Sequence, residues 1–171
     1  NMEDPNCYYL IFALVNGGEL FERIVDQGGF TEKESAYVCI QMLAALRFIH
    51  SKHVVHRDLK PENILVESVE PFPEQKHKDS KRGPEMAYDI RLTDFGLSKL
   101  VAKNYSHAKT FVGTPQYLAP EVIGALRDED GSAYDESVDV WSMGVVAFVM
   151  MSGRYPFDGK SKPFEQQING L

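Results

Sequence analysis

Eight consecutive residues constrain this chain more than any others, and they read His56-Arg57-Asp58-Leu59-Lys60-Pro61-Glu62-Asn63. Taken singly, none is informative, because an isolated aspartate is usually a solvated surface residue. Together they place a carboxylate, a cation and an amide close along the chain. Asp58 can accept the hydrogen of a substrate hydroxyl, Lys60 can neutralise a phosphoryl group, and Asn63 offers a hard oxygen ligand suited to magnesium. Phosphoryl transfer needs these three groups in fixed relation.

Three further motifs follow in the sequence. Asp94-Phe95-Gly96 comes directly after a predicted strand over 89–93 and lies 36 residues beyond Asp58. Residues 113–121 read Gly-Thr-Pro-Gln-Tyr-Leu-Ala-Pro-Glu, and Asp139-Val140-Trp141-Ser142 opens an apolar helix predicted over 137–152. The joint occurrence of four such motifs by chance, in this order and at this spacing, is very improbable.

With these motifs the chain resembles the eukaryotic protein kinases, from the hinge strand to just past the large central helix. The resemblance implies an α+β, protein-kinase-like fold: a mainly α-helical C-terminal lobe with short β-strands, and an N-terminal lobe largely absent. Residues 1–171 would then be a partial kinase domain. Residues 8–12 and 17–21 resemble the hinge of the calmodulin-dependent kinase group. Within that group the likeness is greatest to the FHA-domain checkpoint kinases, on the double tyrosine Tyr8-Tyr9, residues 117–120 and the extra residues 127–133. A calmodulin-regulated relative is the alternative.

The resemblance also implies sites for ATP and Mg²⁺. The nucleotide would contact the gatekeeper Phe12, the backbone of Ala13 and Val15, Glu19 at the ribose, Leu20 and Leu65 on the ring faces, and Asp94 through the metal. Asn63 and Asp94 would be the magnesium ligands. His56 would stack on Phe95, and Asp139 would hold the backbone of the catalytic loop.

Two features are typical of serine/threonine kinases rather than tyrosine kinases. Lys60 lies two places after the aspartate, and Thr114 would bond both Asp58 and Lys60; a simple turn residue is the alternative reading of Thr114. Arg57 matches kinases that are switched by phosphate. A phosphate on Thr110, added by an upstream kinase or by autophosphorylation in trans, would pair with Arg57 and order the loop.

Substrate choice is the last implication of the resemblance. Glu19 and Glu62 resemble acids that attract a basic residue upstream of the phosphorylated serine or threonine. The expected function is therefore ATP-dependent phosphorylation of protein substrates. The alternative is a non-catalytic lobe that acts as a binding or docking module, although the intact Asp58, Asn63 and Asp94 argue against lost chemistry.

Composition narrows the function classes. The net charge is −7, from 25 acids and 18 bases, which argues against a nucleic-acid or an anionic-membrane surface. The longest apolar run, residues 143–151, is too short to span a bilayer. Cys7 and Cys39 show no paired spacing and are expected to be free thiols. Free thiols predict an intracellular protein, cytoplasmic or nuclear, and the nuclear location would follow only from the likeness to the checkpoint kinases.

Element signals follow the hydrophobic pattern. The apolar run 8–15 predicts a buried strand. Apolar spacing predicts a helix over 19–27, stopped by Gly28-Gly29, and a capping box at Thr31 begins a largely buried helix that reaches about His50. Residues 67–88, with three prolines and mixed charge, predict a flexible insert. Its basic stretch 76–82 is read as a solvated loop, with a nuclear-localisation or docking element as the alternative.

Some expected parts of a kinase are missing from the sequence. No glycine-rich loop and no strand lysine precede Tyr8. In the resembling family, Glu121 pairs with an arginine that would lie beyond Leu171, and an unpaired buried carboxylate is costly. Both ends therefore look truncated, and the isolated chain is expected to be poorly stable and inactive in phosphoryl transfer.

Overall fold

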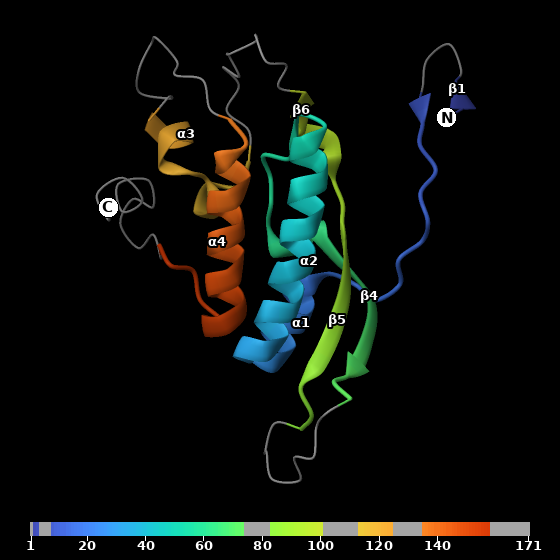
Figure 1. Cartoon of the computed structure of the whole chain (residues 1–171), viewed down its shortest axis with the longest axis vertical. Coiled ribbons are helices and arrows are strands. Elements are labelled where there is room, and N and C mark those ends of the chain that lie inside the picture. Colours follow the sequence, from blue (N-terminus) through green and yellow to red (C-terminus); the bar gives the residue numbers. More distant parts are fainter. Residues whose placement is uncertain (1, 4–7, 74–82, 101–112, 125–134, 158–171) are drawn as a thin grey trace.

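The computed structural model describes residues 2–3, 8–73, 83–100, 113–124 and 135–157 (Figure 1). The helices within these ranges are α1 (Leu20–Gln27), α2 (Glu32–Ser51), α3 (Pro120–Gly124) and α4 (Ser137–Ser152). The strands are β1 (Met2–Glu3), β2 (Tyr8–Tyr9), β3 (Val54–Val55), β4 (Ile64–Pro71), β5 (Met86–Leu92) and β6 (Lys99–Leu100).

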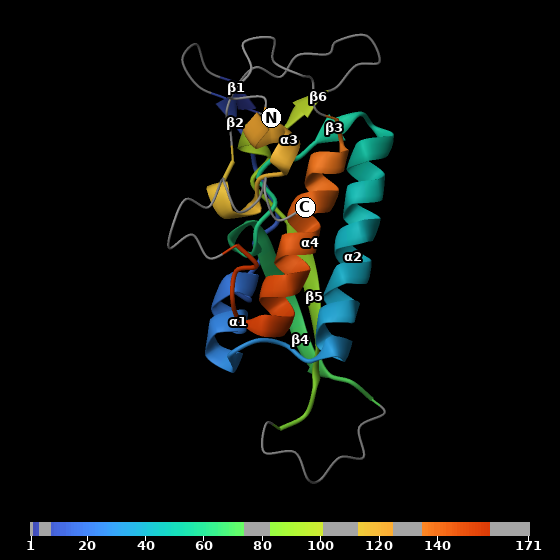
Figure 2. The ribbon, with the colours of Figure 1, turned by 90° about the vertical axis from the view of Figure 1, so that its left-hand side faces the viewer.

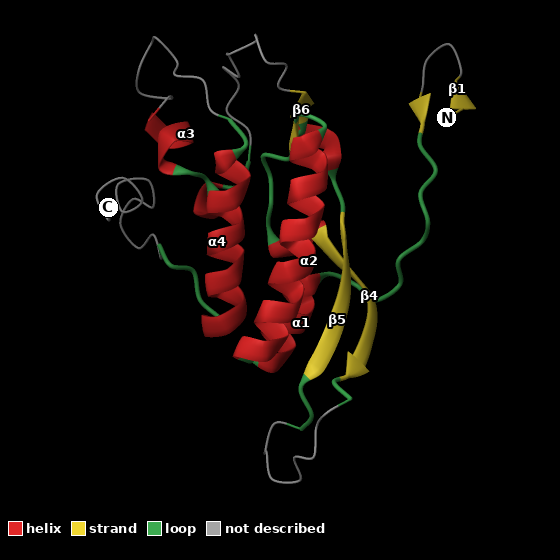
Figure 3. Cartoon of the chain, in the orientation of Figure 1, coloured by secondary structure: helices red, strands yellow, loops and turns green. Residues whose placement is uncertain are grey.

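Helices and small antiparallel sheets make up the mixed fold that was predicted. The described strands form three two-stranded sheets, β1 with β2, β3 with β6 and β4 with β5. In both ribbon views α2 and α4 lie side by side, with the β4–β5 hairpin along α2 (Figures 1 to 3). Among the helices that the structure describes, none combines the length and apolar character needed to cross a membrane.

Local sequence signals set the helix boundaries. Gly28 takes the left-handed conformation at the end of α1. At the start of α2, the Thr31 hydroxyl accepts from the Glu34 amide at 3.2 Å, and the Glu34 carboxylate accepts from the Thr31 amide at 2.8 Å. This reciprocal pair is the predicted capping box. Helix α4 has the predicted bounds.

Only one face of α2 is buried, so the prediction of a largely buried helix was wrong. Val38, Met42, Leu46 and Ile49 recur at helical spacing and pack in the core. The other large apolar side chains of this helix, which are Ile40, Leu43 and Phe48, are 50–67% exposed. The helical period places them on the opposite side, where the described residues offer no covering layer.

The β4–β5 hairpin is joined to α2 through side chains. Glu34, which is buried, also accepts from the Met86 amide at 2.9 Å. Gln41 accepts from the Ile90 amide and donates to the Tyr88 carbonyl. These bonds satisfy β5 backbone groups that no third strand pairs in this part of the chain.

The hairpin corrects the predicted flexible insert at both ends. Residues 67–71 belong to β4 and residues 86–88 belong to β5, in antiparallel register with a shift between Val66 and Ser68. Proline-rich and charged composition had suggested no regular structure here, but pairing with a neighbouring strand outweighs composition. Residues 74–82, which hold the whole basic stretch, lie outside the described residues.

The N-terminal apolar run is not the predicted buried strand. Only Tyr8–Tyr9 is a strand, paired with Met2–Glu3, and Ile11, Phe12 and Leu14 are 79–84% exposed. Figure 1 shows this segment running away from the helices toward the N-terminus. A continuous apolar run indicates burial only where another layer covers it, and no described element covers residues 10–14.

Candidate active site

The catalytic loop, residues 56–63, joins β3 to β4 and is held from beneath by α4. Asp139 of α4 is fully buried, and its two carboxylate oxygens accept from the backbone amides of His56 at 2.9 Å and Arg57 at 2.8 Å. Arg57 has a φ of 69°. A left-handed non-glycine residue needs such support from its surroundings, and Asp139 supplies it.

Asp58 lies at the centre of a polar cluster and is only 7% exposed. Its Oδ1 accepts from both the backbone amide and the hydroxyl of Thr114, each at 3.0 Å. Its Oδ2 lies 3.1 Å from Lys60 Nζ, which also donates to the Thr114 hydroxyl at 2.9 Å. Thr114 therefore makes the contacts with Asp58 and Lys60 that the resemblance to protein kinases had implied.

These contacts change the acidity of Asp58. Burial by itself raises the pKa of the carboxyl group, but hydrogen bonds from Lys60, Thr114 and Asn63, together with the Lys60 charge, outweigh burial and leave the pKa below its usual value. Asp58 is thus an ionised acceptor, held in one orientation, near the surface of the loop.

Asn63 and Asp94 supply oxygen atoms of the kind that magnesium prefers. The Asn63 amide nitrogen donates to the Asp58 backbone carbonyl at 2.8 Å and to its carboxylate at 3.1 Å, which leaves the Asn63 amide oxygen for a metal. Asp94 is exposed and left-handed, with a φ of 59°. One amide oxygen and one carboxylate suit Mg²⁺, which keeps waters and substrate phosphates as its other ligands.

No cluster of three or more His, Cys, Asp and Glu side chains that could hold a metal occurs among the described residues. The fit to Mg²⁺ rests on Asn63 and Asp94, because waters and substrate phosphates usually supply the other ligands of this ion.

The catalytic loop is bonded to the Asp94 segment. His56 is fully buried, its ring lies 2.9 Å from the Thr93 carbonyl, and its centroid lies 4.9 Å from that of Phe95. The Thr93 amide donates to the Asn63 carbonyl at 3.0 Å. The His56–Phe95 contact was expected, while the two Thr93 bonds use backbone groups and left no signal in the sequence.

Gly113 brings the activation segment onto the loop. Its φ is 125°, and a Cβ there would lie 2.9 Å from the Arg57 carbonyl oxygen and 2.8 Å from a Leu118 methyl carbon. No other residue fits both the conformation and the space. The close approach lets Thr114 reach Asp58.

On the nucleotide side, the structure brings together Glu19 and Leu65, which form a backbone bridge. A Cβ at Gly17 would overlap the Val66 carbonyl oxygen, so glycine is needed where the hinge crosses β4. The Val66 amide donates to the Gly18 carbonyl at 2.9 Å. These contacts place the end of the hinge beside Leu65.

The remaining hinge residues are less well placed to contact a nucleotide. Phe12 and Ala13 are exposed, Val15 is partly buried, and all three lie on the irregular segment that precedes Gly17. Leu20 is 0% exposed within the main core, so the expected contact of its side chain with an adenine ring is corrected. The helical face of α1 turns Leu20 inward, and Leu65 is the ring-facing candidate that stays accessible.

The expected regulatory residues are partly described. The Arg57 side chain donates to the Leu97 carbonyl at 2.6 Å, close to the start of the activation segment. Thr110 lies outside the described residues. Glu62 has a buried carboxylate oxygen that accepts no hydrogen bond from any described residue.

Sequence reasoning missed His50. This histidine in the last turn of α2 lies 2.8 Å from the Asp139 carboxylate, although 89 positions separate the two residues in the chain. Nothing in the local pattern of α2 distinguishes it from a helix-terminal surface residue.

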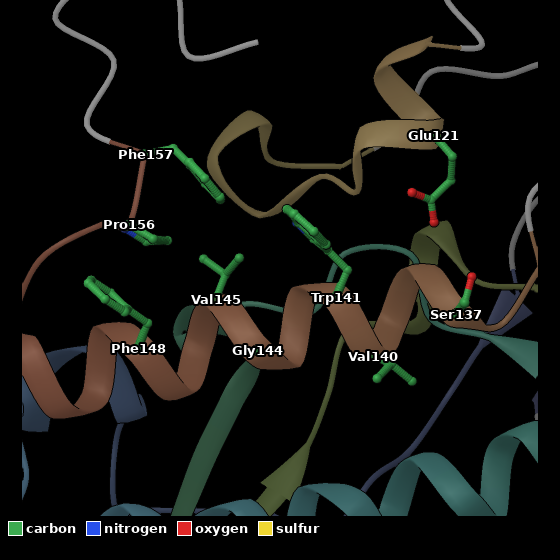
Figure 4. Close-up of a pocket in the computed structure, with 9 residues that line it drawn as sticks. All are labelled: Glu121, Ser137, Val140, Trp141, Gly144, Val145, Phe148, Pro156 and Phe157. Carbon is green, nitrogen blue, oxygen red and sulfur yellow. The ribbon is translucent and has the colours of Figure 1, made fainter. Parts of the chain in front are cut away.

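A concave region that is lined by none of the catalytic residues runs along α4. It has a volume of about 640 Å³ and is lined mainly by apolar side chains along α4, with Glu121 and Ser137 at one end and Phe148, Pro156 and Phe157 at the other (Figure 4). Glu121 is exposed among the described residues, and the arginine with which it is expected to pair would lie beyond Leu171.

Comparison with known proteins identifies the family. The protein kinase domain model matches residues 1–170. The chain is 41% identical to rat calcium/calmodulin-dependent protein kinase type 1B over 94% of its length and 40% of the relative's. It is 37% identical to myosin light chain kinase A of Dictyostelium discoideum, over 96% of the chain and 49% of that protein.

It is also 40% identical to the probable serine/threonine-protein kinase fhkD of the same organism, over 92% of the chain and 20% of that protein. The chain thus spans less than half the length of these relatives. A match over nearly every residue of the chain, with the motif residues gathered around Asp58, shows that it belongs to the protein kinase family.

Proposed function

We propose that this chain is the catalytic-lobe part of an ATP- and Mg²⁺-dependent serine/threonine protein kinase. One observation carries the proposal: the buried, ionised Asp58 is oriented by Lys60, Asn63 and Thr114 together. An acid that only needed to be solvated would have no use for four donors.

In the proposed reaction, a substrate serine or threonine oxygen bonds to the γ-phosphorus of ATP while the bond from that phosphorus to the β–γ bridging oxygen breaks. The hydroxyl proton passes to Asp58, and the products are the phosphorylated protein and ADP. Lys60 Nζ, held beside Asp58 at 3.1 Å, would stabilise negative charge on the transferred group.

Binding of the cosubstrate would use the edge of the loop. The Asn63 amide oxygen and the Asp94 carboxylate would hold Mg²⁺, which neutralises phosphate charge when bound. Glu19 and Leu65, adjacent across their bridge, would meet the ribose and the base. The backbone of Ala13 and Val15, next to the gatekeeper Phe12, would complete the adenine site.

We further propose that the substrate carries a basic residue upstream of its acceptor. The support is Glu62, whose buried carboxylate oxygen lacks a donor among the described residues. Glu19 is the second acid that the resemblance implies for this contact. A guanidinium group would satisfy both the charge and the hydrogen-bond need. We also propose a checkpoint-like role, a cytoplasmic or nuclear location, and activation by a phosphate on Thr110 that pairs with Arg57. Neither nucleic acid nor a membrane is among the proposed partners.

The test is a peptide-library transfer assay with ATP and Mg²⁺ on the native polypeptide that carries this sequence. We expect incorporation into serine or threonine peptides with a basic residue a few places upstream. Asp58→Asn should lower kcat by about 10²- to 10⁴-fold, since it removes the proton acceptor. The matched control is Asp26→Asn, an exposed acid on α1, which should leave the rate unchanged.

The outcomes of this assay distinguish the kinase proposal, the specificity proposal and the docking-module alternative. Transfer without any preference for basic peptides would remove the specificity proposal alone. A folded polypeptide that binds protein partners but transfers no phosphate would make the docking-module reading the correct one.

A further inference from the structure

Asp139 is shared between the catalytic loop and a residue with no assigned role. Its Oδ2 atom accepts from the His56 backbone amide at 2.9 Å and also lies 2.8 Å from His50 Nε2. Its Oδ1 atom accepts from the Arg57 amide at 2.8 Å. Three donors from two separate elements thus converge on one buried carboxylate.

The protonation of the His50 ring follows from its partner. A carboxylate only accepts hydrogen bonds, so Nε2 of His50 must carry the proton. The Asp139 side chain is 0% exposed and that of His50 is 15% exposed, so water has little access to replace the bond. A buried carboxylate needs this compensation, because each lost donor leaves an acceptor uncompensated.

We propose that His50 is a positioning residue for the catalytic loop, acting through Asp139. The proposal rests on the proposed kinase function and names a further residue on which the reaction depends. His50 fixes the rotamer of Asp139, Asp139 fixes the amides of His56 and Arg57, and Asp58 follows directly in the chain. A helix α2 residue thereby sets where the proton acceptor lies.

The effect of losing His50 should fall on turnover rather than on binding. Without it, the Asp139 carboxylate keeps only the His56 and Arg57 amides as donors, and nothing on the α2 side fixes its orientation. Misplacement of a reacting group by about 1 Å costs on the order of a hundredfold in rate. Glu19, Leu65 and Glu62 make no contact with Asp139 in any described interaction, so the Michaelis constants for ATP and peptide should stay unchanged.

The experiment compares three variants in the native polypeptide. His50→Ala removes the donor, His50→Gln keeps an amide N–H of similar reach, and His53→Asn is the matched control. His53 is an exposed histidine three positions along, with a φ of 57° that asparagine tolerates. Peptide phosphorylation gives kcat and KM, and amide hydrogen exchange reports on the His56 and Arg57 amides.

We expect His50→Ala to lower kcat about 10- to 100-fold with both KM values within twofold, and to speed exchange at the His56 and Arg57 amides. His50→Gln should recover most of the rate and the protection, and His53→Asn should change neither. Unchanged kcat and unchanged exchange in His50→Ala would overturn the proposal, as would failure of His50→Gln to recover either one in a folded protein.

The two proposals fail in different ways. If the wild-type polypeptide transfers no phosphate, the kinase proposal fails, and exchange at the two amides still decides whether His50 positions the loop. If the wild type is active and His50→Ala exchanges like the wild type, only the positioning role is lost.

Discussion

The catalytic loop and the hinge segment were both identified from sequence motifs, yet the structure treats them in opposite ways. The loop, residues 56–63, is bonded to α4 through Asp139, to the activation segment through Thr114 and to the strand end at Thr93. The hinge, residues 10–16, is mostly exposed until Gly17 anchors it on β4.

The difference comes from which partners the two segments need. Polar loop groups require donors and acceptors at fixed positions, and the described part of the chain supplies them. Apolar hinge side chains require a covering layer, and the described part of the chain does not supply one. Contacts among the described residues therefore fix the geometry of the catalytic loop, whereas they do not fix the geometry of the hinge.

The largest effect should be a loss of kcat when the hydrogen bonds of Thr114 to the catalytic loop are removed. Thr114→Val keeps the shape but removes a hydroxyl that bonds both Asp58 and Lys60. A hydrogen bond to a charged group contributes about 1.5–3 kcal/mol, so kcat should fall on the order of 10- to 100-fold. Peptide phosphorylation under saturating ATP measures the loss.

Thr114→Ser provides the control, since it retains the hydroxyl and loses only a methyl group. We expect it to stay within a few-fold of the wild type. Equal losses in the two variants would mean that packing of the methyl group, rather than the hydrogen bonds, is what the loop requires.

A smaller effect should appear in the dependence of stability on pH. The pKa of Asp58 is lowered in the folded state, so the unfolded state takes up this proton at a higher pH than the folded state. The contribution is therefore fully present above the unfolded pKa and is lost as pH falls through the lowered folded pKa. Urea midpoints measured across acidic pH should show a steeper decline for the wild type than for Asp58→Asn.

Thr114→Val sharpens this measurement. It removes one of the bonds that lower the Asp58 pKa, so the folded pKa moves closer to the unfolded pKa. Its acidic loss of stability should therefore be smaller than in the wild type and should be complete at a higher pH. Identical profiles for the wild type and Asp58→Asn would show that Asp58 is not the group responsible.

Local signals were enough for much of the fold. The capping box at Thr31, the glycine stop after Gln27 and the apolar run of α4 each fixed an element boundary within a residue or two, because each depends on neighbours in the chain. The inward orientation of Leu20 and the strands at both ends of the predicted insert depend on distant partners. Local sequence patterns therefore did not predict them.

The catalytic cluster was predicted by motif spacing, but its support was not. Asp58, Lys60 and Thr114 were expected to meet, and they do. His50 and the backbone of Thr93 were missed. A histidine at a helix end and a backbone carbonyl carry no local pattern, and their partners lie far away in the sequence.

The smallest effect should come from the hinge. Phe12 is 80% exposed, so Phe12→Ser should change the free energy of unfolding of the 171-residue chain by about 0.5 kcal/mol or less. Leu20→Ala, at a fully buried position only eight residues away, should cost about 2–5 kcal/mol. Urea denaturation of both variants gives the ratio. A cost for Phe12→Ser that approached that of Leu20→Ala would mean the hinge has its own covering layer, and the contrast between the two segments would no longer hold.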